Sequence, residues 1–107
     1  MELSHSVIEL MLREMGETPQ DVANTIRKAG IKGARCVASR CPVSKYLEKQ
    51  FDEADGAVIT TGRTRIEIHK HGTGVVNDIV VYTTPAIHDF TWLFDSKQDF
   101  QDLADLP

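Results

Sequence analysis

Two cysteines and two histidines are the residues whose types and spacing come nearest to a metal centre. Four residues separate Cys36 from Cys41, and His69 and His71 share one face of an expected strand. A structural zinc site needs four such ligands around one ion, and its cysteines normally come in close pairs. The spacing here fits that pattern poorly. We therefore expect an ordinary loop thiol at Cys36, a small buried or capping group at Cys41, and neither a metal nor another cofactor.

Cys41 also carries the sharpest enzymatic hypothesis. It precedes Pro42 at the expected start of a helix, and Arg35, Arg40 and Lys45 are close to it in sequence. A helix N-terminus and neighbouring cations lower the pKa of a thiol and raise its reactivity. A nucleophile also needs a base and an oxyanion site, and no pattern in the sequence positions a histidine for either role. We predict no catalytic residue and keep a thiol- or metal-dependent enzyme centred on Cys41 as an alternative.

Positive charge is concentrated in the middle of the chain. The net charge is -4, yet residues 27–50 contain seven cations against Glu48 alone, a local sum of +6. Such a concentration of one sign favours contact with an anionic partner. We predict a small non-enzymatic binding or regulatory protein whose cations converge on one solvent-facing surface that contacts a protein partner. The predicted contact residues are Arg27, Lys28, Lys32, Arg35, Arg40, Lys45 and Lys49.

Nucleic acid is the alternative partner for this basic segment. The segment precedes an expected hairpin that carries Arg63 and Arg65. That order is reminiscent of a winged helix-turn-helix, in which a recognition helix and a hairpin contact DNA. Ten residues lie between Gly30 and Cys41, however, where that motif has a short turn, and the chain is acidic overall. A DNA- or RNA-binding regulator therefore remains the second hypothesis.

The helices that must position these cations are predicted from hydrophobic periodicity and capping residues. Ser6 and Glu9 have the spacing of a capping box at the start of a first helix. A second helix should begin after Thr18, span about residues 19–29 and end at Gly30, which suits a left-handed stop. A third should begin at Pro42, because proline fits the first helical turn.

Three β-branched segments follow and predict a sheet. Residues 57–61 and 64–69 should form a hairpin, with residues 79–82 as a third strand. The second strand alternates, so its isoleucines should face the core and its charged residues the solvent. The third is uninterruptedly apolar, which predicts a central strand covered on both faces.

A fourth helix after Pro85 should close the core. It contains Phe90, Trp92 and Phe94, which are large aromatic side chains suited to a core. Residues 96–107 form either a short docking turn or a frayed end. The predicted fold is therefore a single α+β domain over residues 1–107, with N-terminal helices, a small three-stranded and largely antiparallel sheet, a C-terminal closing helix and a loosely docked tail.

Length and composition limit the class of protein. A chain of 107 residues with 41% hydrophobic and 26% charged residues is typical of one globular domain. No apolar run approaches the ~20 residues that span a bilayer, and the N-terminus does not resemble a signal peptide. We expect a cytoplasmic protein without a membrane partner, in which reducing conditions disfavour a disulfide between the cysteines. An exposed sheet edge or the methionine-rich first helix could pair with a second copy.

Two short patterns in the chain carry a family resemblance. One is Ala29-Gly30-Ile31 followed by Gly33, and the other is C-P-V-S-K-Y-L from Cys41 to Leu47. With these patterns the chain resembles a family of small bacterial proteins without an assigned activity, found mainly in actinobacteria and their phages. The resemblance implies a helix, sheet, helix domain of bacterial or phage origin, and it supplies no catalytic residue.

Overall fold

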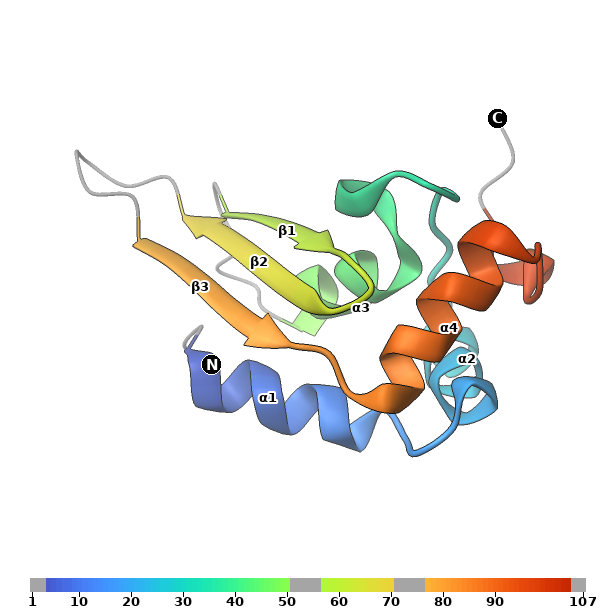
Figure 1. Cartoon of the computed structure of the whole chain (residues 1–107), viewed down its shortest axis with the longest axis horizontal. Coiled ribbons are helices and arrows are strands. Elements are labelled where there is room, and N and C mark those ends of the chain that lie inside the picture. Colours follow the sequence, from blue (N-terminus) through green and yellow to red (C-terminus); the bar gives the residue numbers. More distant parts are fainter. Residues whose placement is uncertain (1–3, 51–56, 71–76, 105–107) are drawn as a thin grey trace.

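The computed structural model describes residues 4–50, 57–70 and 77–104 (Figure 1). Within these residues, helices cover one face of an antiparallel sheet and pack beside it, which confirms the predicted α+β fold class. No described helix has the length and apolar character needed to cross a membrane. The elements are α1 (His5–Glu14), α2 (Pro19–Lys28), the 3₁₀ turn η1 (Ala38–Arg40), α3 (Pro42–Gln50), β1 (Ala57–Thr61), β2 (Arg65–Lys70), β3 (Asn77–Tyr82), α4 (Pro85–Ser96) and the 3₁₀ turn η2 (Gln101–Leu103).

The N-terminus of α1 differs from the prediction. The capping residue is Ser4, whose hydroxyl accepts a hydrogen bond from the amide of Val7 at 3.3 Å. The predicted capping box of Ser6 and Glu9 is therefore wrong, because both residues lie inside the helix. Glu9 instead pairs with Arg13 one turn later, at 3.3 Å.

Both predicted ends of α2 are confirmed. The hydroxyl of Thr18 accepts from the amide of Asp21 at 3.1 Å, and the helix starts at the following proline. At the other end Gly30 is left-handed, with φ of 70°. The amides of Gly30 and Ile31 then donate back to the carbonyls of Arg27 and Ile26, which is the Schellman arrangement. This stop turns the chain sharply into the segment 31–41.

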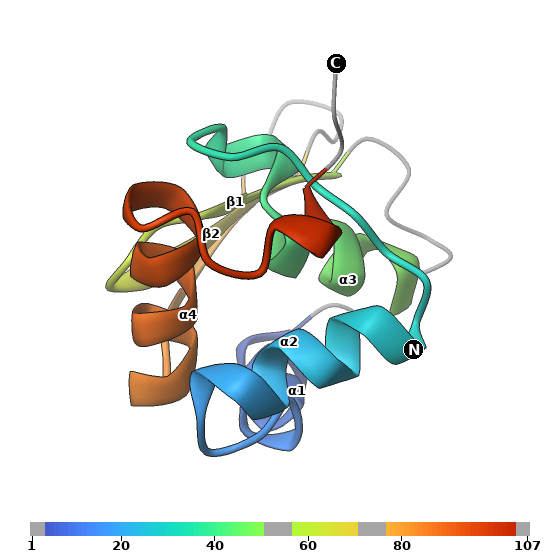
Figure 2. The ribbon, with the colours of Figure 1, turned by 90° about the vertical axis from the view of Figure 1, so that its right-hand side faces the viewer.

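The three strands form a meander in the order β1-β2-β3, with β2 in the middle. Ile68 of β2 lies opposite Ile59 of β1 and Ile79 of β3. Ile59, Ile66 and Ile68 are fully buried, so the predicted alternation along β2 is confirmed. Helix α1 packs against β3 and α3 packs against β1 on this inner face, while α2 packs against α4 beside the sheet (Figures 1 and 2).

The prediction that the third strand is central and covered on both faces is wrong. Among the described strands, β3 pairs with β2 alone and forms one edge of the sheet. Its side chains alternate: Val81 is fully buried, whereas Val80 is 40% and Tyr82 is 76% exposed on the outer face. The run of apolar residues in β3 therefore arises because its outward-facing residues are apolar as well, and not because other elements cover both faces of the strand.

Helix α4 closes the core with phenylalanines. Phe90 and Phe94 are fully buried, and the centroid of Phe90 lies 5.8 Å from that of Phe94 and 5.3 Å from that of Phe100. Trp92, which was expected with them, faces outward and is 37% exposed. The ammonium of Lys97 lies 5.2 Å from its ring centroid. The core is thus closed by a stack of three phenylalanine rings and not by the tryptophan.

The segment after α4 packs back onto the domain as far as residue 104. Leu103 is buried, and its carbonyl accepts a hydrogen bond from the amide of Gly33 at 2.9 Å. Gly33 and Ala104 form an isolated parallel bridge. These contacts dock the described part of the tail, while residues 105–107 lie outside the described ranges. The segment 31–41 is therefore held from the C-terminal side of the chain.

Candidate functional site

The predicted contact residues lie along one connecting segment and on the helix ends beside it. The segment 31–41 runs from the end of α2, over η2, toward the C-terminal end of α4 (Figure 2). We call its exposed cations, with those of the adjoining helix ends, the basic loop surface. This surface consists of Lys28, Lys32, Arg35, Arg40 and Lys49, all exposed. The other two predicted residues, Arg27 and Lys45, are half-buried.

Arg27 anchors the tail. Its guanidinium donates two hydrogen bonds to the carboxylate of Asp102, at 2.6 and 2.9 Å, and a third to the side chain of Asn24 at 2.9 Å. It also lies over the ring of Phe100, 5.9 Å from the centroid. The hydrogen bonds between Arg27 and Asp102 lower the pKa of the Asp102 carboxyl and raise the pKa of the Arg27 guanidinium. Arg27 therefore belongs to the contacts that build the surface and not to its exposed charge.

Two lysines of α3 also have partners. The ammonium of Lys45 lies 3.9 Å from the carboxylate of Glu48. Lys49 donates to the carbonyl of Ala29 at 2.8 Å, and Ala29 is the C-cap of α2. A lysine is favourable there because the carbonyls at a helix C-terminus carry partial negative charge. This bond joins the last turn of α3 to the end of α2 and brings Lys49 close to the start of the segment 31–41.

Three cations of the basic loop surface lack a salt-bridge partner among the described residues. Lys28, Lys32 and Arg35 are exposed and form no salt bridge within the described residues. Lys32 lies near enough to Asp102 to contribute to the lowered pKa of that carboxyl. These three side chains are the part of the predicted surface that is available to a partner.

The backbone of the segment is fixed at three points. The amide of Ala34 donates to the carbonyl of Arg40 at 2.7 Å, and the amide of Gly33 to that of Leu103 at 2.9 Å. The amide of Cys36 donates to the carboxylate of Asp95 at 2.9 Å. Cys36 adopts a left-handed conformation, with φ of 61°. The cations therefore project from an ordered connection, which ends in the short turn η1.

Cys41 lies in an environment opposite to that of a reactive thiol. It is 3% exposed, and burial raises its pKa to about 11. Beside it, the hydroxyls of Ser44 and Thr61 are 2.6 Å apart and buried. Desolvation outweighs the helix N-terminus, so the thiol keeps its proton at neutral pH. The enzymatic hypothesis therefore loses the lowered pKa on which it was based.

The two thiols should differ in reactivity. At about pH 8, iodoacetamide should modify exposed Cys36 in the folded chain and leave Cys41 intact until denaturant is added, because access and ionisation both limit alkylation. Mass spectrometry of the digested protein reads out each site. Modification of Cys41 at the rate of Cys36 in the native protein would contradict the packing described here.

The same thiol predicts a pH dependence of stability. Folded Cys41 keeps its proton up to about pH 11, whereas the ordinary value for a thiol is 9.0. Between these values the unfolded chain binds fewer protons, so the free energy of unfolding should fall as pH rises. Urea titrations at several pH values in this range measure the free energy of unfolding of the native chain and of Cys41→Ala. The decrease that is due to the Cys41 thiol should be absent from the variant.

No metal centre is found in the described part of the chain, where no three His, Cys, Asp or Glu side chains gather around one point. Cys36 lies beside Asp95, Cys41 is buried, and His69 lies on the outer face of the sheet, 3.6 Å from the carboxylate of Glu67. His71 lies outside the described residues. The candidate ligands that can be placed are thus on different parts of the fold.

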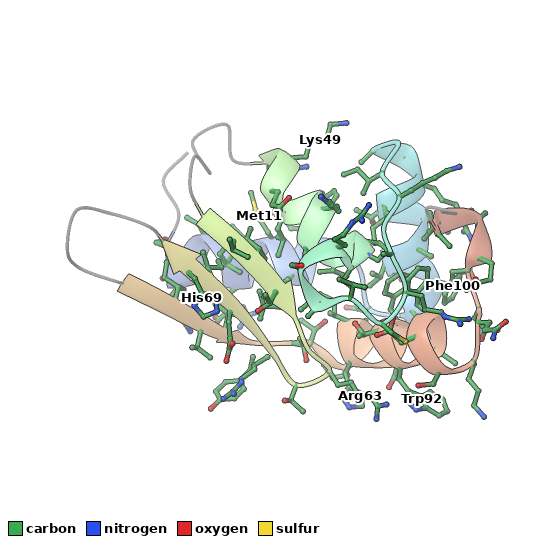
Figure 3. All side chains as sticks on the ribbon, turned by 90° about the horizontal axis from the view of Figure 1, so that it is seen from above. Met11, Lys49, Arg63, His69, Trp92 and Phe100 are labelled. Atoms are coloured by element: carbon green, nitrogen blue, oxygen red, sulfur yellow. The ribbon has the colours of Figure 1, made fainter. Side chains whose placement is uncertain are left out.

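The hairpin and α3 do not form one DNA-facing surface. Figure 3 shows Lys49 and Arg63 on opposite sides of the molecule. Arg63 lies beside α4, 3.5 Å from the hydroxyl of Ser96, and Arg65 pairs with Glu67 at 3.0 Å. A winged helix-turn-helix needs its wing and its recognition helix on the same face. The arrangement that suggested nucleic-acid binding is therefore not formed by these residues.

The sequence pattern did not reveal Asp95 and Asp102 as part of the site. Asp95 holds the middle of the segment 31–41 through Cys36, and Asp102 binds Arg27 in the last turn of α2, just before the segment. The only signal available was the presence of aspartates near the end of the expected fourth helix and in the tail after it. A second feature that the sequence did not indicate is a pair of adjoining hollows, of about 370 and 430 Å³, that share Thr84 at the start of α4. Their linings hold no concentration of one charge comparable with the basic loop surface.

Comparisons of the chain with protein-family models, with curated proteins and with solved structures found no match. The resemblance stated from the sequence stays a prediction.

Proposed function

We propose that this chain is a small binding protein, without an enzymatic role, that captures a protein partner through its basic loop surface. The observation that carries the proposal is that three exposed cations, Lys28 at the end of α2 and Lys32 and Arg35 in the segment 31–41, form no salt bridge within the described residues. Backbone hydrogen bonds fix the segment that carries Lys32 and Arg35. An ordered segment has already lost much of the entropy that binding would otherwise cost. Clustered charge of one sign also speeds the encounter with an oppositely charged face.

An acidic protein face suits this surface better than nucleic acid. The carboxylate of Asp95 lies beside Cys36 within the segment, that of Asp102 binds Arg27 just before it, and the chain carries a net charge of -4. An extended polyanion would pass close to these acids, whereas a compact acidic patch can meet the cations alone. A cytoplasmic location belongs to the same proposal, because exposed Cys36 suits a reducing compartment.

Charge reversal tests this proposal. The triple variant Lys28→Glu, Lys32→Glu and Arg35→Glu should lose capture of the partner, because three attractive charges become repulsive in an otherwise unchanged fold. Tagged protein is cross-linked in lysate of the source cells, and captured proteins are quantified by mass spectrometry. We expect at least about a tenfold loss of the partner that the native chain enriches.

A matched control separates local from overall charge. The variant Arg13→Glu, Arg63→Glu and Arg65→Glu changes the net charge by the same amount at exposed positions outside the segment. It should retain the partner. Equal loss in both variants would refute the proposal. A salt-dependent gel shift of DNA or RNA that disappears only in the first variant would replace the protein partner with nucleic acid.

A further inference from the structure

The two edge strands of the sheet, β1 and β3, have different neighbours. Strand β1 is flanked by η1 and α3, which both pack against it. Strand β3 pairs with β2 on one side. Figure 3, which looks onto the outer face of the sheet, shows no described helix or strand alongside its other edge. Among the described elements, β3 therefore provides the uncovered edge.

The hydrogen-bond pattern identifies which backbone groups of β3 face outward. The amide of Thr83 donates to the carbonyl of Thr64 at 3.0 Å, so residue 83 points toward β2. In an antiparallel ladder both polar groups of a residue point to the same neighbour, and successive residues alternate. Ile79 and Val81 therefore bond to β2, while the amides and carbonyls of Val80 and Tyr82 point away from the sheet.

The side chains of these same two residues are exposed and apolar. Val80 is 40% and Tyr82 is 76% exposed. The strand Asn77–Tyr82 contains no proline and no lysine, the residues most often used to block an open edge, and Asp78 near its start is its one charged residue. Unpaired backbone groups and exposed apolar side chains thus occur together on one short edge.

We propose that β3 pairs antiparallel with β3 of a second copy across a two-fold axis, which joins the sheets into one of six strands. With Val80 opposite Tyr82 of the other copy, each residue exchanges both backbone hydrogen bonds, and the exposed ring covers the exposed valine. We choose a second copy as the partner because a two-fold interface must be complementary to itself. In this register the outward backbone groups of Val80 and Tyr82 pair with those of Tyr82 and Val80 in the other copy, and their apolar side chains meet. The basic loop surface adjoins the opposite edge through η1 and stays accessible in both copies.

The test compares two valines with nearly equal exposure on opposite edges. Val80 is 40% and Val58 is 39% exposed. Sedimentation equilibrium of the full chain should show a monomer–dimer equilibrium, with dimerisation weakened at least about tenfold by Val80→Lys and unchanged by Val58→Lys. Both substitutions are at exposed positions, and circular dichroism checks that each variant folds. A native chain that remains monomeric at the highest accessible concentration, or equal weakening by both substitutions, would overturn the proposal.

Hydrogen exchange of the native chain gives a second readout that needs no variant. The amides of Val80 and Tyr82 should become protected as the protein concentration rises, whereas those of Ile79 and Val81 should be protected throughout. If the first pair stays unprotected in the associated protein, the copies meet elsewhere and the proposal is wrong. Protection that appears only when another protein is added would assign the edge to a strand of that protein instead.

Discussion

Replacing Phe90 by alanine should lower the free energy of unfolding by about 3 to 5 kcal/mol, the largest loss expected from any single truncation in this chain. Phe90 is fully buried and lies between the rings of Phe94 and Phe100, with centroids 5.8 and 5.3 Å away. Removing it leaves a cavity at the point where α4 and the tail meet. Urea unfolding followed by circular dichroism at 222 nm measures the difference.

Trp92 on the same helix is the matched control. It is larger than Phe90 but 37% exposed, with Lys97 beside its outer ring face. Trp92→Ala should therefore cost about 1 kcal/mol or less. Leu93, which is half-buried, should fall between the two. A loss at Trp92 equal to that at Phe90 would mean that α4 is rotated relative to the packing described here.

The sequence predicted those features that depend on neighbouring residues. The Thr18 cap, the glycine stop at Gly30 and the helix start at Pro42 each follow from local backbone preferences, and all three are confirmed. The three-stranded sheet is confirmed for the same reason, since turns and β-branched segments are local signals. Capping at Ser4 instead of Ser6 shows the limit, because several nearby residues can satisfy the same amides.

Features that depend on distant partners were not predictable. Nothing near Tyr82 in sequence says which face of β3 is covered, so its apolar run was interpreted as a central strand. Arg27 and Asp102 are 75 positions apart, and only folding reveals that this cation is already paired. The pKa of Cys41 was misjudged for a related reason, since the nearby cations are visible in the sequence whereas burial is not.

A glycine inside the basic segment gives the second large prediction. A Cβ at Gly33 would overlap the carbonyl oxygen of Arg40 and lie 2.5 Å from the nitrogen and 2.8 Å from Cδ of Pro42. These atoms belong to the backbone and a proline ring, so none can move by a simple side-chain rotation. Gly33→Ala should therefore cost about 2 to 4 kcal/mol of folding stability, measured by the same urea titration.

Gly30→Ala separates this overlap from the conformational effect of losing a glycine. Gly30 has a positive φ of 70° but nothing within 4 Å of its Cβ position, so its replacement should cost only about 1 kcal/mol.

The two glycine substitutions should also differ in their effect on partner capture. In Gly33→Ala the new Cβ should push the backbone around Lys32 away from that around Arg40 and weaken the hydrogen bond from the amide of residue 33 to the carbonyl of Leu103. If the basic loop surface binds a partner because it is held in one shape, Gly33→Ala should weaken capture under conditions where the variant is still folded, and Gly30→Ala should weaken it much less. Equal stability and equal capture in the two variants would show that the segment is neither tightly packed nor required in a fixed conformation.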